Sequence, residues 1–300
     1  MYLDRLDGVG LRRLEAALHA GDPVQLVGRP PSRVPMDEIL PLCHGADDIS
    51  LSALLPPAGR GGTDIAVTAV IPTHRHRPIG IDALSAQDVE VEVIVLANGT
   101  FEGGVRVAWE GHGRTRQRGV ELARHPYVLF TVDDARVLGA GMVRTMVEAL
   151  EGGGYDAVVA RQIPWPTADA VTRTRLRGWT PPGTGHRGTD VLDNVCSLYR
   201  RAALLSDPFD DVAIAEDWHW GRRHRIGYVP AAPVLHSHPR RLGPLFSRTR
   251  AIHRERIRAG LPPSVPDLPS LLRALPSTLG PDLRGALGEL FGQYAATRTG

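Results

Sequence analysis

The sequence predicts an α/β fold in which a mostly parallel, Rossmann-like sheet is flanked by helices. Short apolar segments rich in β-branched residues alternate with segments of helical spacing between residues 64 and 160. Polar or acidic residues stand directly after three of these apolar segments. Alternating strands and helices connect parallel strands by crossovers, so we expect those polar residues at one edge of the sheet.

The predicted strands are buried runs, and the segments between them have the apolar spacing of helices. The four strands are Asp64–Pro72, Val89–Leu96, Pro126–Val132 and Ala157–Ala160. The turn pair Asn98–Gly99 follows the second strand. The three helices are Asp82–Gln87, Arg114–Arg124 and Val137–Leu150, the last of them closed by Gly152–Gly154.

Two regions flank the predicted sheet domain, which spans residues 64–240. Residues 1–63 are an N-terminal extension, with helical spacing over Leu3–Leu18, a short strand within Pro23–Gly28 and a linker at Pro56–Gly62. Residues 241–300 are a C-terminal helical region, with helices expected over Leu268–Tyr294. No apolar run approaches the roughly 18–20 residues that cross a bilayer, and the start does not resemble a signal peptide. We therefore expect a cytoplasmic protein.

The composition excludes several classes of function. All 35 basic residues are arginine, so a Walker A phosphate loop and a Schiff-base enzyme, which both need lysine, are excluded. No G-x-G-x-x-G motif follows a strand, which argues against dinucleotide binding. The formal net charge of +2 does not indicate a nucleic-acid partner. Cys43 and Cys196 lack the spacing of a metal pair or a disulfide framework.

The polar residues at the strand ends form the first candidate site. Thr73 and His74 follow the first strand, Asn98 follows the second, and Asp133 and Asp134 follow the third. Two adjacent carboxylates repel each other unless a cation offsets their charge, and Mg²⁺ or Mn²⁺ bound there can bridge a diphosphate. The alternative is that an aspartate caps the following helix.

A second candidate cluster lies within residues 208–238. Glu216 and Asp217 open a predicted helix, where a carboxylate can act as a general base toward a hydroxyl or simply cap the helix. His236 ends an apolar segment and can supply a nitrogen ligand to a metal, or it can be a hydrogen-bonded core histidine. Because side chains alternate along a strand, we expect only one of His236 and His238 to reach the site.

Four segments together resemble glycosyltransferase family 2. They are AVIPTHRHRP at the first strand, VEVIVLANG at the second, RTRQRGVELARHPYVLFTVDDARVLGAGMVRTMVEAL around the third, and NVCSLYRRAALLSDPFDDVAIAEDWHWGRRHRIGYVPAAPVLHSH in the second half. The HSH ending is similar to the rhamnosyltransferase-like branch. The resemblance covers roughly residues 64–240, and it implies the GT-A fold of that family.

The resemblance also implies an activity and a set of roles. It implies inverting transfer of a sugar, such as the deoxysugar rhamnose, from a dTDP- or UDP-linked donor to a hydroxyl of a glycan, a lipid-linked acceptor or a small molecule. Asp217 matches the catalytic base, with Glu216 as the second candidate, and Asp134 and His236 match the ligands of Mg²⁺ or Mn²⁺. The positions that match the nucleotide-binding region are Thr73, His74, Asn98, Arg116, Arg118 and Asp133.

One departure from the family pattern keeps other functions open. The family has an aspartate that contacts the nucleotide after the second strand, and this chain has Ala97. A nucleotide-sugar-binding protein without catalysis is therefore one alternative. A sugar nucleotidyltransferase is another, although the first strand is not followed by the glycine-rich basic loop of those enzymes. A zinc hydrolase is disfavoured because the histidines lack HExxH spacing.

Two regions carry weaker signals. Trp165 and Trp179, in a segment rich in proline and glycine, can stack on a sugar ring or anchor a long loop by packing. Residues 240–258 are basic with interleaved apolar side chains. They predict either peripheral contact with the anionic inner face of a membrane or a solvated helix face.

Overall fold

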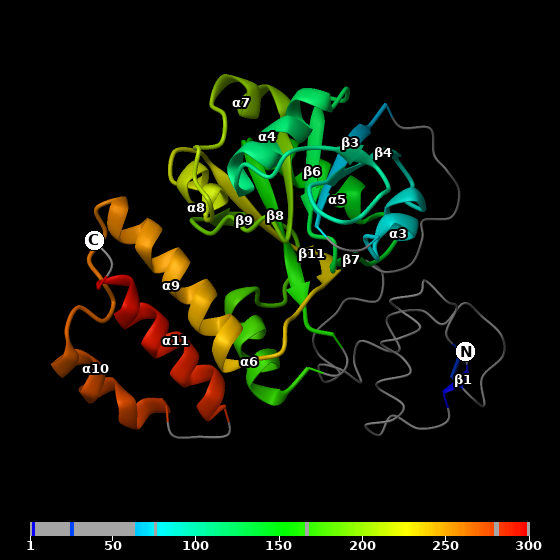
Figure 1. Cartoon of the computed structure of the whole chain (residues 1–300). Coiled ribbons are helices and arrows are strands. Elements are labelled where there is room, and N and C mark those ends of the chain that lie inside the picture. The colour runs from blue at the N-terminus through cyan, green and yellow to red at the C-terminus, as the bar shows by residue number, and fades with distance from the viewer. Residues whose placement is uncertain are drawn as a thin grey trace.

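The computed structural model describes residues 2–3, 25–26, 64–74, 77–165, 168–278 and 282–298. Within them, a nine-stranded sheet has the order β5-β4-β3-β6-β10-β8-β11-β7, and β9 pairs with β11 (Figure 1). Its strands are β3 (Ala66–Thr73), β4 (Glu90–Ala97), β5 (Val105–Arg106), β6 (Tyr127–Thr131), β7 (Arg136–Val137), β8 (Ala157–Ile163), β9 (Arg187–Thr189), β10 (Cys196–Arg200) and β11 (Ile226–Leu235). A separate parallel pair joins β1 (Tyr2–Leu3) to β2 (Gln25–Leu26).

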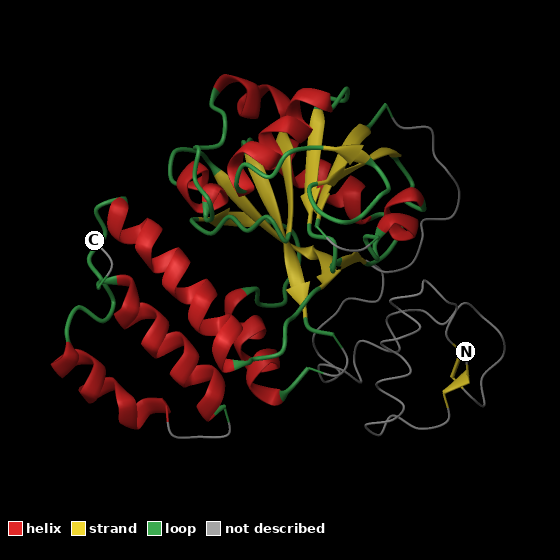
Figure 2. Cartoon of the chain, in the orientation of Figure 1, coloured by secondary structure: helices red, strands yellow, loops and turns green. Residues whose placement is uncertain are grey.

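Helices cover the sheet and extend beyond it (Figure 2). Around the sheet are α3 (Ile81–Ser85), α4 (His112–Leu122), α5 (Met142–Gly153), α7 (Arg201–Ser206) and α8 (Glu216–Gly221). The helix α6 (Ala170–Trp179) lies beside the C-terminal helices instead, where its Arg175 pairs with Glu289 (Figure 1). The C-terminal group contains α9 (Leu242–Arg258), α10 (Leu268–Ala274), the 3₁₀ turn η2 (Leu275–Thr278) and α11 (Leu283–Ala296). None of the helices in this described part of the chain combines the length and apolarity that crossing a bilayer needs.

Most strands of the sheet run parallel, as predicted, but β10 inside the sheet and β7 and β9 beside β11 run antiparallel to their neighbours. β3 pairs in parallel with β4 and β6, and β8 pairs in parallel with β11. β10 lies between β6 and β8 and is antiparallel to both, with Cys196 opposite Thr131. The residues that precede β10 therefore lie at the same edge of the sheet as the carboxyl ends of β6 and β8.

Most predicted elements are confirmed, and two boundaries are corrected. The predicted strand at Ala157–Ala160 continues to Ile163, because its whole length pairs with β11. The helix predicted from Val137 begins at Met142 instead, because Arg136 and Val137 form β7 by pairing with the end of β11. In the N-terminal extension, β2 lies within the strand predicted at Pro23–Gly28. The helix predicted over Leu3–Leu18 and the linker lie outside the described residues, except that Leu3 belongs to β1.

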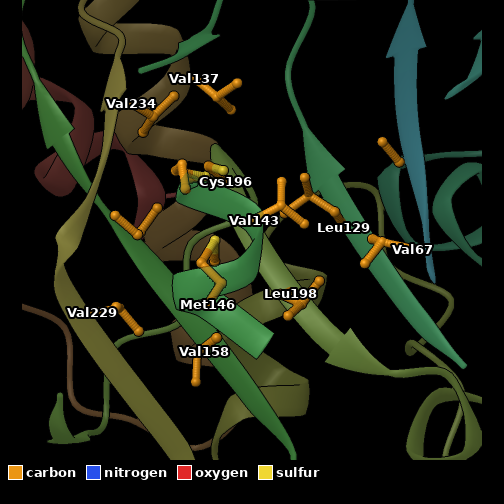
Figure 3. Packing of buried hydrophobic residues seen from close by; sticks show 14 of the residues in the cluster. Val67, Leu129, Val137, Val143, Met146, Val158, Cys196, Leu198, Val229 and Val234 are labelled. Carbon is orange, nitrogen blue, oxygen red and sulfur yellow. The ribbon is translucent and has the colours of Figure 1, made fainter. Parts of the chain in front are cut away.

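Each face of the sheet buries its own apolar cluster. On one face, Val143 and Met146 of α5 pack against Leu129 and Leu198 of the strands (Figure 3). On the other face, α4, α7 and α8 enclose a cluster with four aromatic rings: Phe130, Tyr199, Phe209 and Trp220. Because helices cover both faces, functional polar groups are restricted to the sheet edges.

The C-terminal helices pack closely because glycines line one side of α11. A Cβ atom on Gly288 would lie 2.6 Å from the carbonyl oxygen of Leu242, and one on Gly292 would lie 2.7 Å from that of Phe246. The side of α9 that carries Leu242, Leu245, Phe246 and Thr249 therefore faces α11. Arg248 lies about 120° around α9 from the middle of that side, given 3.6 residues per turn.

Candidate functional site

Asp134, His236 and His238 form a compact cluster at the ends of β6 and β11. Nε2 of His236 lies 3.6 Å from Oδ1 of Asp134, and Nδ1 of His238 lies 3.4 Å from Oδ2. The Nε2 atoms of the two histidines are 3.2 Å apart. His236 is buried, whereas the side chain of His238 is 51% exposed. The cluster therefore opens to solvent on the His238 side.

The expectation that only one histidine reaches the site is wrong. It assumed that the strand continues through both residues, so that their side chains would alternate between faces. β11 ends at Leu235, and residues 236–238 are not part of a strand, although the amide of His236 still donates to the carbonyl of Ile163 at 2.9 Å. Both imidazoles consequently turn toward the same carboxylate.

The cluster fits a divalent cation. One ligand atom from each residue can be chosen so that all lie within 4.8 Å of one another. Opposite ligands about 2 Å from one ion lie about 4 Å apart, so small side-chain movements would complete the site. Burial lowers the pKa of His236 to about 4, with the charges of His238 and Arg248 adding to the effect and that of Asp134 opposing it. Its imidazole is neutral at pH 7, as a metal ligand must be. Two nitrogen donors beside a carboxylate suit Mn²⁺ better than Mg²⁺, which prefers oxygen.

The two adjacent aspartates have separate partners. Asp133 accepts a hydrogen bond from the hydroxyl of Thr73, with 2.8 Å between Oγ1 and Oδ2. Asp134 faces the two histidines. The amide of Asn98 donates to the carbonyl of Thr73 at 3.0 Å, and the carbonyl of His74 accepts from Thr100 at 2.7 Å. These bonds bring the ends of β3, β4 and β6 together, as the sequence predicted.

Glu216 is held in a buried ion pair behind this edge. Its Oε1 accepts from Nη1 of Arg116 at 2.6 Å and from Nδ2 of Asn194 at 3.0 Å. The side chains of Arg116 and Glu216 are only 7% and 3% exposed. Burial alone would raise the pKa of Glu216, but the charges of Arg116 and His112 and the bond from Asn194 hold it below its usual value. Glu216 is therefore a buried carboxylate that keeps its negative charge in the pair with Arg116.

Removing the partner of Glu216 is expected to destabilise the fold strongly. Arg116→Leu leaves a buried carboxylate without its cation, which typically costs about 3–5 kcal/mol. Urea unfolding at pH 8 measures the loss. Arg114→Leu is the matched control, because Arg114 lies on α4, as Arg116 does. Arg114 pairs with Asp211, and both of these side chains are more than half exposed. The control should cost far less, because solvent screens an exposed ion pair. Equal losses in the two variants would contradict the buried pair.

Asp217 is more exposed than Glu216, and its pKa is shifted in the opposite direction. It is half-buried, and its carboxylate accepts hydrogen bonds from the backbone amides of Asn194 at 2.9 Å and Trp218 at 2.7 Å. Burial, followed by the charges of Glu216 and Asp193, raises the pKa of Asp217 to about 7. A carboxyl group with this pKa can take up a proton near neutral pH.

The remaining predicted residues lie around this arrangement. Arg118 pairs with Glu121 on the exposed side of α4, beside a surface cavity of about 480 Å³, and its contact with a nucleotide stays a prediction. Trp165 is 5% exposed, in agreement with a packing role, whereas Trp179 is 57% exposed. Cys196 is buried and unpaired, and Cys43 lies outside the described residues.

Comparisons with known proteins bear on the fold. No family model matches the sequence, and no curated protein matches it either. Among solved structures, the mannosyltransferase PcManGT from Pyrobaculum calidifontis, in complex with GDP-Man and Mn²⁺, is 14% identical, with 97% of each chain covered and a TM-score of 0.55. The predicted GT-A fold is confirmed.

Two further structures match over part of the chain. TarS 1-349 from S. aureus, in complex with UDP-GlcNAc, is 14% identical and has a TM-score of 0.45 over 66% of this chain and 68% of its own. GalNAc-T7 with UDP, GalNAc and Mn²⁺ is 11% identical and has a TM-score of 0.44 over 58% of this chain and 44% of its own.

Sequence reasoning missed three residues at this edge: Gln162, Asp193 and Asn194. Gln162 is the second-to-last residue of β8, and Asp193 and Asn194 lie just before β10. The antiparallel insertion of β10 carries Asp193 and Asn194 to the carboxyl ends of the parallel strands. The sequence signal that could have found Asp193 and Asn194 is that this polar pair stands directly before the apolar segment VCSLY.

Proposed function

We propose that this protein is an inverting, metal-dependent glycosyltransferase that uses a nucleotide-sugar donor. The observation that carries the proposal is Asp217, a half-buried carboxyl group whose pKa is about 7, at the sheet edge that also holds the Asp134, His236 and His238 cluster. A base and a cation site at one edge match the needs of a transfer in which a hydroxyl attacks and a diphosphate leaves.

Asp134, His236 and His238 would hold the cation. When bound, Mn²⁺ or Mg²⁺ supplies positive charge that stabilises the departing diphosphate. The donor set favours Mn²⁺. Asp133, fixed by Thr73, lies next to the cation site in the chain, and in this proposal it orients the donor.

Asp217 acts as the general base in this proposal. It accepts the proton of the acceptor hydroxyl while that oxygen forms a bond to the anomeric carbon and the bond from this carbon to the phosphate oxygen breaks. Attack opposite the leaving group inverts the anomeric configuration. Glu216 keeps its negative charge in the pair with Arg116, and this charge helps to hold the pKa of Asp217 high. Glu216 is thus a positioning residue rather than the base.

The donor nucleotide is proposed to lie over the ends of β3 and β4. Thr73, His74 and Asn98 lie there, with Arg118 on the following helix α4. Arg116, which the sequence resemblance also placed at the nucleotide, is instead buried in its ion pair with Glu216. Ala97 leaves no carboxylate for the base or ribose, so recognition of the nucleotide differs from the usual family pattern. A dTDP- or UDP-linked deoxysugar such as rhamnose is the donor that the sequence resemblance favours.

Arg248 is a further proposed contact for the diphosphate. It is exposed, lies on a side of α9 away from α11, and forms no ion pair within the described residues. Its charge contributes, after burial and Arg116, to the lowered pKa of His112, and it also lowers the pKa of His236. These effects on both histidines support a position of Arg248 near the cation cluster.

Replacing Arg248 is expected to weaken nucleotide binding. Arg248→Ala should lower the affinity for a nucleoside diphosphate with Mn²⁺ by about 10-fold to 100-fold, the usual effect of losing a charged hydrogen bond. Isothermal titration calorimetry measures it. Arg256→Ala is the control, since it lies about 12 Å further along the same helix. Equal affinity in the wild type and Arg248→Ala would remove Arg248 from the binding site.

The acceptor is proposed to be a glycan, a lipid-linked intermediate or a small molecule. Residues 240–258 contribute seven arginines, and α9 begins directly after the cation cluster. Peripheral contact of this helix with an anionic membrane at the cytoplasmic face would bring a lipid-linked acceptor to the site. Cosedimentation with anionic vesicles tests this contact.

A screen of nucleotide sugars with and without Mn²⁺ tests the proposed function. A true donor at about 100 times its Kd should raise the unfolding temperature by about 5 °C, and only when Mn²⁺ is present. The same donor should then release its nucleoside diphosphate slowly to water, and faster with an acceptor. Binding without any release would favour the nucleotide-sugar-binding alternative. Release of pyrophosphate from a nucleoside triphosphate and a sugar phosphate would favour the nucleotidyltransferase.

A further inference from the structure

The side chain of Gln162 joins the cation cluster to the loop that precedes β10. Its Oε1 lies 3.1 Å from Nδ1 of His236, and its Nε2 donates to Oδ2 of Asp193 at 2.8 Å. Gln162 is only 5% exposed. Both ends of a buried amide therefore have a defined partner, as buried polar groups require.

The chemistry of these partners fixes which nitrogen of His236 carries its proton. A carboxylate only accepts hydrogen bonds, so Asp193 requires the NH₂ end of Gln162 to point toward it. The amide oxygen then faces Nδ1 of His236, and that nitrogen must be the donor. In a neutral imidazole the other nitrogen, Nε2, then carries the lone pair. It is Nε2 that faces Asp134 and His238.

The same chain of contacts continues to Asp217. Asp193 also accepts from the amide of Val195 at 3.0 Å, which holds the loop in place. The next residue, Asn194, donates its backbone amide to Asp217 and its side-chain amide to Glu216. The hydroxyl of Tyr199 donates to Oδ1 of Asn194 at 2.7 Å. A buried hydrogen-bond network thus connects the cation cluster with the carboxyl groups of α8.

We propose that Gln162, oriented by Asp193, is a positioning residue that holds His236 as the Nδ1–H tautomer with Nε2 free to bind a cation. The role of the cation rests on the proposed function, but the tautomer does not. Partners of this kind typically change metal affinity by about 10-fold to 100-fold, because they fix the ring and its free nitrogen.

Nitrogen NMR of the metal-free full-length protein tests the tautomer directly. With ¹⁵N-labelled histidine at pH 8, where ordinary histidines are neutral, His236 is assigned by its loss in His236→Gln. The Nδ1–H form is expected in the wild type. Asp193→Asn, which allows the amide of Gln162 to turn over, is expected to give a mixture of tautomers. A wild-type proton on Nε2 would overturn the proposal, whatever the catalytic activity proves to be.

Titration with Mn²⁺ alone tests the consequence for binding. Gln162→Leu should weaken Mn²⁺ binding by about 10-fold to 100-fold, as measured by electron paramagnetic resonance. Gln87→Leu is the matched control. Gln87 is also buried, at 8% exposed, and makes three hydrogen bonds, but it lies between α3 and α5. Its loss should lower stability and leave Mn²⁺ affinity unchanged. Equal Mn²⁺ affinity in Gln162→Leu and the wild type would overturn the positioning role.

A double variant separates positioning from general damage. Asp193→Asn with Gln162→Glu exchanges donor and acceptor between the two side chains, while the carboxylate at 162 still accepts from Nδ1–H of His236. Mn²⁺ affinity and the Nδ1–H tautomer should return toward wild-type values, relative to Asp193→Asn alone. A double variant that is no better than the single one, with unchanged unfolding temperature, would contradict the mechanism.

Discussion

Asp217→Asn is expected to lower kcat by a factor of about 10² or more, because a general base typically contributes that much. The amide is almost isosteric with the carboxyl group and cannot take up the proton. Its NH₂ group also cannot accept, so one of the two backbone hydrogen bonds to Asp217 is lost. Folding should be preserved, since burial already disfavours the charged form of Asp217. Turnover at saturating donor and acceptor, with the unfolding temperature as a check, measures the effect.

The pH dependence of kcat/KM gives the same test in the wild type. The pKa of Asp217 is raised from 3.8 to about 7, and only the deprotonated form is a base. We therefore expect kcat/KM to fall as the pH drops through about 7. The folded state binds this proton more tightly than the unfolded chain, so the contribution of Asp217 to stability is largest below 3.8 and is lost as the pH rises through 7.

Asp211→Asn is the control for both measurements, because Asp211 is exposed and pairs with Arg114 on the surface. It should keep the wild-type turnover and pH profile. Full turnover in Asp217→Asn would show that another group accepts the proton.

Asp134→Ala is expected to abolish cation-dependent binding of the donor. The substitution removes the only carboxylate among the three clustered ligands and leaves two imidazoles. Calorimetry of a nucleoside diphosphate with Mn²⁺ should show an affinity loss of about 100-fold or more, while binding without Mn²⁺ stays as weak as in the wild type. The carboxylate is 33% exposed, so its removal should cost little stability.

Asp211→Ala is again a suitable control, since it also removes one exposed carboxylate. Wild-type Mn²⁺-dependent affinity in Asp134→Ala would exclude Asp134 as a cation ligand. A parallel loss in Asp211→Ala would indicate a general effect of surface charge instead.

The parallel part of the fold could be predicted because it depends on local patterns. Apolar segments at Ala66–Thr73, Glu90–Ala97 and Tyr127–Thr131 are short, β-branched and separated by helical spacing. The polar residues after these parallel strands were therefore expected at the carboxyl ends of the sheet. The hydrogen bond between Thr73 and Asp133 confirms that they meet there. The antiparallel strand β10 was not predicted, because its position depends on pairing with residues more than 60 positions earlier in the chain.

The division of roles within the site depended on contacts that a sequence pattern does not contain. Glu216 and Asp217 are adjacent carboxylates at a helix start, and only their partners distinguish them. Arg116, 100 residues earlier, neutralises one, and the Asn194 backbone holds the other. In the same way, His236 could be predicted as a ligand, but His238 could not, because both histidines face Asp134 only where β11 ends at Leu235.

The most direct test of the account is anomalous diffraction from crystals that contain Mn²⁺ and a nucleoside diphosphate. We expect a single strong manganese peak bound by Asp134, His236 and His238, with the diphosphate in contact with the ion and facing the side that carries Asp217. A diphosphate bound elsewhere, or manganese bound without these three side chains, would contradict the proposed site.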